Sequence, residues 1–536
     1  MSVGDSYLTA RACSRFLTYI FDEFMEAQIT ALRNSPVFSI LVDAATDVST
    51  KDLIAVYCRH LVEGRPVNTF IGVEELQHCN AQGYVAAIDS LLQSVGLQDW
   101  QGKTVGFGSD GAAVMIGAKS GVATRLRNDS IPWLVNIQCL AHGLELAAMD
   151  VLKSHPVMLK IHDLLKGVHK QYHYSPKAWR ELKSVGEALQ TKVWKPTNLG
   201  GTRWLPHIKA ALETMMRNFG PLTVHLQETA SAQTASADMV GRAKNASKLL
   251  CDHKNLLYTH FFLDILSVLS RLSLQLQADA LTLPKLLANF ETALLTLIGM
   301  KTEDGDHLEG YRKDSSGGLF DGQTLKNCNQ DTTERFQEER VAVLDSVHKA
   351  LTNRFKCLDT DGVIKAASKL VDPRDWPDEP EELALFGAQD IQLLLGHFAE
   401  VLGSAGCDVK AARRDEWPAL KTAVKRLPRS QQGQGLIQEM MQHEDKREDF
   451  KNLFLLMETI LVLPLSTASC ERCFSAMKRV KSDWRSNLQT ATLSKLLYIS
   501  VEGPEIEDYD CQPALERWWQ EAQGTRRPHQ SDSQSQ

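Results

Sequence analysis

The hydrophobic pattern at the start of the chain changes from helical to strand spacing. Residues 6–33 carry apolar side chains near helical spacing, and Ser35-Pro36 ends that stretch. A short apolar run at 37–42 and two alternating segments at 53–61 and 67–73 then read as strands. Gly64-Arg65-Pro66 separates the last two segments as a hairpin turn. The pattern therefore predicts one helix followed by three antiparallel strands.

The next segments alternate between helix and strand. Apolar residues lie on one face of a predicted helix at 82–96, and 103–107 reads as a fourth strand. A helix is expected from about Gly117, a fifth strand at 133–138 and a further helix from 139 to 152. Strands mixed with helices in this order predict one α/β core.

From about residue 156 onward the pattern is helical. Residues 256–276 and 283–298 are strongly apolar helices, and Pro464 divides two helices at 448–463 and 466–482. The Gly- and Asp-rich segment 301–333 is expected to be disordered.

Composition adds two limits. The 536 residues contain 43% hydrophobic and 23% charged residues, as in an ordinary globular protein. The net charge of −7 argues against a surface that is basic throughout, although it allows a local basic groove. Eleven scattered cysteines suit a reducing compartment better than a disulfide framework, and no membrane span is expected.

Three carboxylates are candidates for chemistry. Asp43 and Asp110 each end a predicted strand, and Glu471 lies in the first turns of a predicted helix. Carboxylates are ligands for Mg²⁺-type ions, and two such ions can activate an attacking oxygen and stabilise a leaving one. The ordinary alternative is that the aspartates form turns and Glu471 balances a helix N-terminus. Spacing alone favours that alternative.

The segment Gly106 to Gly111 has the form GxGxxG, after a strand and before a helix. A dinucleotide-binding loop is therefore an alternative. It is disfavoured because the segment follows the fourth strand and carries Asp110, whose charge would face a pyrophosphate.

Cysteine, histidine and basic residues offer further candidates. Cys139 and His142 with Cys470 and Cys473 form a possible zinc set, but the two halves are short and far apart, so local architecture is the favoured interpretation. Arg203 and Trp204 are suited to binding a phosphate and stacking on an unpaired base, or to anchoring a loop. A basic cluster after Glu471 could bind phosphates or form a solvated helix face: Lys478, Arg479, Lys481 and Arg485.

Several of these segments together resemble the hAT superfamily of DNA transposases, in the order of that family. The segments are FSILVDAATD (38–47), GSDGAAVM (108–115), CLAH (139–142), TRW (202–204) and STASCERCFSAMKRVKSDWRSNL (466–488). The last is similar to the family's C-terminal dimerisation region. The resemblance implies a ribonuclease-H-like mixed sheet interrupted by a long helical insertion, so the fold class is α/β plus all-α and mostly helical.

The resemblance also assigns roles to residues. It implies that Asp43, Asp110 and Glu471 are the catalytic and metal-binding triad, with Mg²⁺ or Mn²⁺ as cofactor if the protein is active. It implies that Cys139 and His142 match the family's CxxH motif, and that Arg203 and Trp204 match a site that steadies a flipped base.

The resemblance divides the chain into five predicted parts. They are an N-terminal helical segment (1–34), the first part of the core (35–165), the helical insertion (166–450), the closing helices with the dimerisation region (451–505) and a mostly disordered tail (506–536). No Cys/His zinc finger of the kind that such transposases carry precedes Asp43, so no zinc finger is expected in this chain.

The expected function follows from these departures. We expect a transposase-derived, non-mobile nuclear protein that forms homodimers or higher oligomers through its C-terminal region. It would bind DNA or chromatin proteins and no membrane. The alternative is an active Mg²⁺-dependent transposase that uses the Asp/Asp/Glu site for strand cleavage and transfer.

Overall fold

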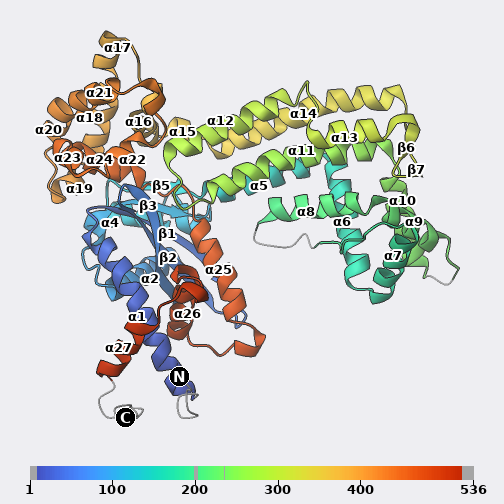
Figure 1. Ribbon diagram of the computed structural model, residues 1–536, viewed down its shortest axis with the longest axis horizontal. Helices are drawn as coiled ribbons and strands as arrows, with labels where there is room; N and C mark the ends of the chain where they lie inside the picture. The colour runs from blue at the N-terminus through green and yellow to red at the C-terminus, as the bar shows by residue number, and fades with distance from the viewer. Residues whose placement is uncertain (1–8, 198–202, 234–235, 522–536) are drawn as a thin grey trace, which may run out of the picture. The chain divides into compact units, whose positions relative to one another are not determined.

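A five-stranded mixed sheet organises one part of the chain (Figure 1). The computed structural model describes residues 9–197, 203–233 and 236–521. The strand order is β3-β2-β1-β4-β5, in which β1 is antiparallel to β2, β2 is antiparallel to β3, and β1 is parallel to β4. The strand bounds are β1 Phe38–Thr46, β2 Asp52–Val62, β3 Arg65–Glu75, β4 Thr104–Ser109 and β5 Val135–Gln138. The predicted fold class and the antiparallel opening are confirmed.

The chain divides into two compact units. The first, here called the sheet unit, comprises Met1–Ile137 and Pro377–Gln536, and the second, the helical unit, comprises Gln138–Trp376. The sheet unit's principal helices are α1 Ala10–Asn34, α2 Ala81–Ser94, α4 Val122–Asp129, α18 Ala388–His397, α19 Ala399–Ser404, α21 Trp417–Lys425, α22 Leu436–Met440, α23 Glu444–Asp449, α24 Lys451–Leu461, α25 Ala468–Val480, α26 Thr490–Glu502 and α27 Gln512–Glu521.

One face of the sheet is covered by helices from the far end of the sequence. Buried side chains of β1, β2 and β3, including Leu41, Tyr57 and Phe70, share a core with α25 and α26. Ser494 Oγ of α26 accepts from the Val73 amide at 3.2 Å, and Tyr498 donates to Gln28 of α1 at 2.8 Å. Residues more than 400 positions apart therefore complete one hydrophobic core.

The helical unit is built almost entirely from helices. Its long members are α5 Leu140–Ser154, α6 Pro156–His173, α7 Pro176–Ala188, α8 Trp204–Arg217, α9 Phe219–Ser231, α10 Ala237–Leu250, α11 His253–Leu276, α12 Leu283–Gly299, α13 Asp306–Asp314, α14 Gln330–Arg354 and α16 Gly362–Val371. The central helix α11 is buried around most of its circumference, as expected for a helix that is apolar on nearly all sides. Among the described residues, no helix has the length and apolarity needed to cross a membrane.

The segment 301–333 is ordered, contrary to the prediction of disorder. It contains α13 and a small hairpin of β6 Leu319–Phe320 with β7 Gln323–Thr324. Buried Asp264 accepts from the amides of His307 and Leu308 at 2.9 and 3.0 Å and so caps α13. Composition missed this order because the anchoring carboxylate comes from a distant helix.

Two predicted domain limits also differ from the observed units. Residues 377–450, predicted to belong to the insertion, pack within the sheet unit, where Glu416 accepts from the Leu453 amide at 2.7 Å and His397 bonds to the Trp133 carbonyl at 2.8 Å. In the predicted tail, residues 512–521 form α27, whose Trp518 ring lies 5.3 Å from that of Phe16 in α1. The rest of the tail, 522–536, lies outside the described residues.

Candidate active site

Strand register places the two predicted aspartates on adjacent parallel strands. Leu41 of β1 pairs with Gly108 of β4. Asp43 and Asp110 each lie two residues further along, at the same end of the sheet. Neighbouring strands are about 4.8 Å apart, so both carboxylates are brought to one edge by backbone geometry.

The third carboxylate reaches this edge through a close crossing over β4. Pro464 packs on β4 so tightly that a Cβ at Gly106 would lie 2.6 Å from its Cδ, and one at Gly108 would lie 2.8 Å from its Cβ. Three residues after the buried Leu465, α25 begins, and Glu471 lies in its first turn. Gly106 and Gly108 of the GxGxxG segment therefore make room for Pro464, which gives these two glycines a packing role unrelated to phosphate binding.

The electrostatics of Asp43 show that the three carboxylates interact. Asp43 is half-buried and accepts a hydrogen bond from the Ala44 amide at 2.9 Å. Burial raises the pKa of Asp43 to about 7, the Ala44 hydrogen bond opposes this, and the negative charges of Asp110 and Glu471 raise it further. Like-charge repulsion of this kind is typical of carboxylates grouped for function.

The carboxylates at this edge have the donor atoms that a hard divalent cation prefers, but they do not lie close enough together to hold one. Carboxylate oxygens are preferred by Mg²⁺. Within residues 9–197, 203–233 and 236–521, no three His, Cys, Asp or Glu side chains lie close enough together to hold one metal ion. The triad is thus assembled at one edge without a preformed metal cage.

The predicted basic cluster separates into exposed and buried members. Lys478, Arg479 and Arg485 are exposed. Lys481 differs from the prediction, because its side chain is 1% exposed and its Nζ lies 2.5 Å from Oδ2 of Asp47, which is also 1% exposed. Lys481 is therefore part of the interior and is no surface cation for nucleic acid.

The Asp47–Lys481 pair links the two parts of the chain that carry the carboxylates. Asp47 follows the end of β1, and Lys481 immediately follows α25. Burial alone would raise the pKa of Asp47, but hydrogen bonds from Lys481, the Lys51 amide and Ser49 lower it. Sequence reasoning missed this pair because its members are 434 residues apart. The one local signal was a second acid, Asp47, at the end of the DAATD segment that begins with Asp43.

The cysteine motifs have structural roles. Cys139 is the N-cap of α5, where its Sγ accepts from the His142 amide at 3.5 Å. Cys470 and Cys473 are fully buried in the core beneath β1–β3, and burial raises the pKa of Cys473 to about 12. The favoured interpretation of local architecture agrees with these positions.

Arg203 and Trp204 lie at the start of α8 in the helical unit. Both are half-buried, and the Trp204 ring lies 6.3 Å from the ring of His162 in α6. Thr202 lies outside the described residues. This packing agrees with the loop-anchoring alternative, and the base-binding role stays a prediction.

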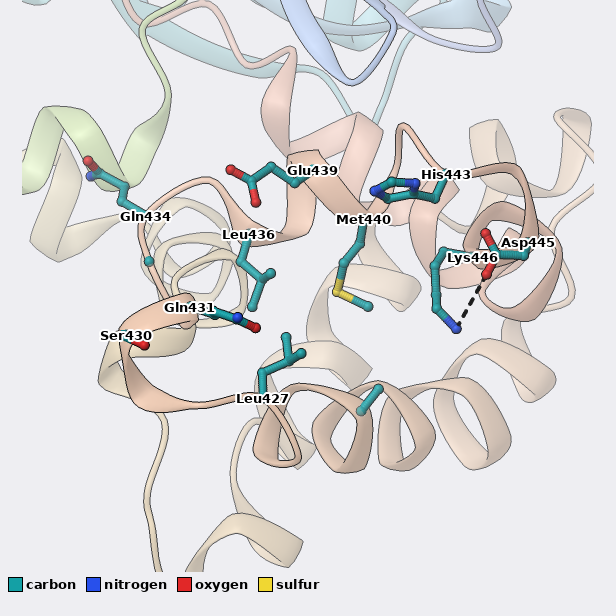
Figure 2. Close-up of a pocket in the computed structure, with 12 residues that line it drawn as sticks. Leu427, Ser430, Gln431, Gln434, Leu436, Glu439, Met440, His443, Asp445 and Lys446 are labelled. Atoms are coloured by element: carbon teal, nitrogen blue, oxygen red, sulfur yellow. Dashed lines mark ion pairs between the residues drawn. The ribbon is translucent and has the colours of Figure 1, made fainter.

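A cavity of about 530 Å³ between α21 and α22 contains none of the predicted site residues (Figure 2). Leu427, Leu436 and Met440 contribute its apolar lining, and Lys446 and Asp445 form an ion pair beside it. Sequence reasoning gave no sign of this cavity because its lining comes from short helices without a distinctive motif.

Comparison with known families agrees with the fold and with the order of the segments. Residues 6–121 match the ZMYM1/FAM200 RNase-like domain, which covers β1 to β4 with Asp43 and Asp110. Residues 441–501 match the hAT family C-terminal dimerisation region, which covers α25 with Glu471 and supports self-association as a homodimer or oligomer. These two matches support a relationship to hAT-family, transposase-derived proteins over the matched segments.

Proposed function

We propose that this protein is a non-mobile, nuclear descendant of a transposase, which self-associates through its C-terminal region and binds nucleic acid or chromatin partners. The dimerisation match over residues 441–501 supports self-association. Because the net charge is −7, contact with nucleic acid would be restricted to a local basic surface. Exposed Lys478, Arg479 and Arg485 are available for such contact.

Trp484 is the observation that carries the self-association proposal. It lies between α25 and α26, inside the matched region, and is 97% exposed. Exposed tryptophans are rare on monomer surfaces and frequent at energetically dominant interface positions. Because Trp484 is continuous with a dimerisation region, we propose that a second copy of this chain covers it.

Sedimentation velocity of the full chain at micromolar concentration tests this proposal. We expect a dimer or larger species, and we expect Trp484→Ala to weaken it by roughly 30-fold or more. Trp194→Ala, at an exposed tryptophan outside the matched region, is the control. A monomeric wild-type protein, or equal association of both variants, would contradict the proposal.

The second candidate function is metal-dependent DNA strand cleavage and transfer. The parallel pairing of β1 with β4, which brings Asp43 and Asp110 to the same end of the sheet, favours it, as does the charge interaction of Asp110 and Glu471 with Asp43. Incubation with nicked and hairpin-forming DNA ends in Mg²⁺ or Mn²⁺ distinguishes the two candidates. Cleavage abolished by Glu471→Gln but retained by Glu505→Gln, an exposed acid elsewhere in the unit, would overturn the non-mobile proposal.

The nuclear assignment has its own test. Imaging a fluorescent fusion of the full chain in fixed and live cells would show nuclear enrichment if the assignment is correct. Uniform cytosolic fluorescence would remove it without affecting the self-association proposal.

A further inference from the structure

Positive charge is concentrated in one part of the helical unit. Between Lys166 and Arg217 there are ten Lys and Arg residues and three Glu residues, a net charge of +7 in a chain whose net charge is −7. The described members of this set lie on α6, α7, the following loop and α8. Such a local excess is the electrostatic signature expected of a polyanion-binding surface.

The loop after α7 is held rigidly against its neighbours. Val193 packs on α7 at Gly186, where an added Cβ would lie 2.3 Å from its Cγ2. Buried Asn218 accepts from the Trp194 amide at 2.9 Å and donates to the Trp194 carbonyl at 2.7 Å. The backbone that carries Lys192, Trp194 and Lys195 is therefore fixed in place.

Cations flank the aromatic rings of this surface. Trp194 is 43% exposed, with Lys192 Nζ 4.1 Å and the Arg217 guanidinium 5.9 Å from its ring centre. Lys183 lies 5.2 Å from the ring centre of half-buried Trp179. The charge of Lys195 contributes to lowering the pKa of His169, after burial and His173, which places the loop beside the end of α6.

We propose that these elements form a binding surface for unpaired nucleic acid, here called the basic surface and defined by Lys183, Lys192, Trp194, Lys195 and Arg217. The lysines contact phosphates, while Trp194 stacks on a base whose face is free. A duplex offers its phosphates but not its base faces, so a single strand is the better ligand. The inference rests on the proposed binding of nucleic acid and assigns that binding a place in the fold.

The alternative partner is an acidic polypeptide, which the lysines alone could also attract. The exposed indole between two cations favours nucleic acid, because every base provides a flat face for stacking whereas a run of Asp and Glu does not. The contribution of Trp194 therefore distinguishes the two partners.

Fluorescence anisotropy with a labelled oligothymidylate of about 20 nucleotides, longer than a typical single-strand site, tests the inference on the full chain. We expect Lys183→Glu/Lys192→Glu/Lys195→Glu to weaken binding by more than about tenfold and to reduce the salt-dependence slope by about 2, since each lost phosphate contact contributes about 0.7. A control with the same net charge, Lys349→Glu/Lys356→Glu/Lys365→Glu, alters exposed lysines of α14 to α16 and should stay within about threefold.

Trp194→Ala keeps the inference testable if the triple variant unfolds. We expect it to weaken oligothymidylate binding by about fivefold and to leave duplex binding nearly unchanged. Equal losses in the test and control variants, no effect of Trp194→Ala, or equally strong competition by polyglutamate would overturn the inference. In each of these cases wild-type binding leaves the proposed function standing, whereas a wild-type protein that binds neither DNA form would refute the nucleic-acid part of that function as well.

Discussion

Lysines in the two units occupy opposite surroundings. Lys481 of the sheet unit is buried and paired with Asp47, whereas Lys192 of the helical unit is exposed over the Trp194 ring. Both occur in basic, tryptophan-containing stretches of sequence. The difference shows that a run of Lys and Arg indicates a charged neighbourhood but not which members face the solvent.

Removing the buried lysine should give the largest effect on stability. Lys481→Met leaves the Asp47 carboxylate buried without its cation, which typically costs about 3–5 kcal/mol. Urea unfolding followed by circular dichroism measures this loss, and exposed Lys478→Met is the matched control. Asp47→Asn combined with Lys481→Met should recover part of the loss, and a single-variant loss below about 1 kcal/mol would show that the pair is dispensable.

Glu458 is a half-buried acid whose contribution to stability should respond to pH in the opposite sense to that of Asp47. Burial raises the pKa of Glu458 to about 7, against the opposing influence of Ser35 and Arg447. The folded state therefore holds this proton more tightly, so the associated stability is complete below pH ~4.5 and is lost as the pH rises to about 7.

Comparing the free energy of unfolding of the Glu458→Gln variant with that of the wild-type protein at several pH values measures this contribution. At pH 8 the variant should be more stable than the wild-type protein by up to about 3 kcal/mol, and at pH 4 the two should nearly coincide. Taking the difference between the two proteins cancels the contribution of Asp43, which titrates in the same range. A difference that does not change with pH would contradict the prediction.

Glycine substitution tests how closely the chain packs beside the carboxylates. Gly106→Ala places a Cβ 2.5 Å from Ser39 Oγ and 2.6 Å from Pro464 Cδ, so we expect a loss of about 1–3 kcal/mol by overpacking. Gly102→Ala is the control, since a Cβ there meets nothing within 4 Å. Thermal unfolding compares the two, and equal stabilities would show that β4 yields at little cost.

The smallest effect is expected at the CxxH motif. Cys139→Ala removes the N-cap of α5 and should cost about 1 kcal/mol, while Cys139→Ser keeps a capping oxygen and should cost less. Chemical unfolding with and without added Zn²⁺ provides the measurement. A zinc-dependent stability that is lost in both variants would instead indicate a metal ligand.

The sequence predicted elements whose signals are local. The helix before Pro36, the hairpin at Gly64 and the strands that end near Asp43 and Asp110 all have short-range patterns that the structure confirms. The grouping of Asp43, Asp110 and Glu471 was predicted from the resemblance alone. The parallel pairing of β1 with β4 gives a geometric basis for the two aspartates.

Features that depend on distant contacts were not predictable in this way. The burial of Lys481 requires Asp47, the order of 301–333 requires Asp264, and α27 packs on α1. No short-range pattern encodes these partners. The residues of the basic surface lie close together in the sequence, but the net charge of the whole chain is negative and does not reveal this local positive charge.

The closure of the sheet by α25 and α26 has a consequence for synthesis on the ribosome. The strands β1, β2 and β3 that carry Leu41, Tyr57 and Phe70 are synthesised by residue 75, whereas the covering residues Phe474, Leu497 and Tyr498 are synthesised about 400 residues later. At translation rates of about 5–20 residues per second, the apolar face of these strands waits on the order of tens of seconds for its cover. The nascent chain therefore passes through a prolonged state in which the apolar face of β1, β2 and β3 is accessible to other chains.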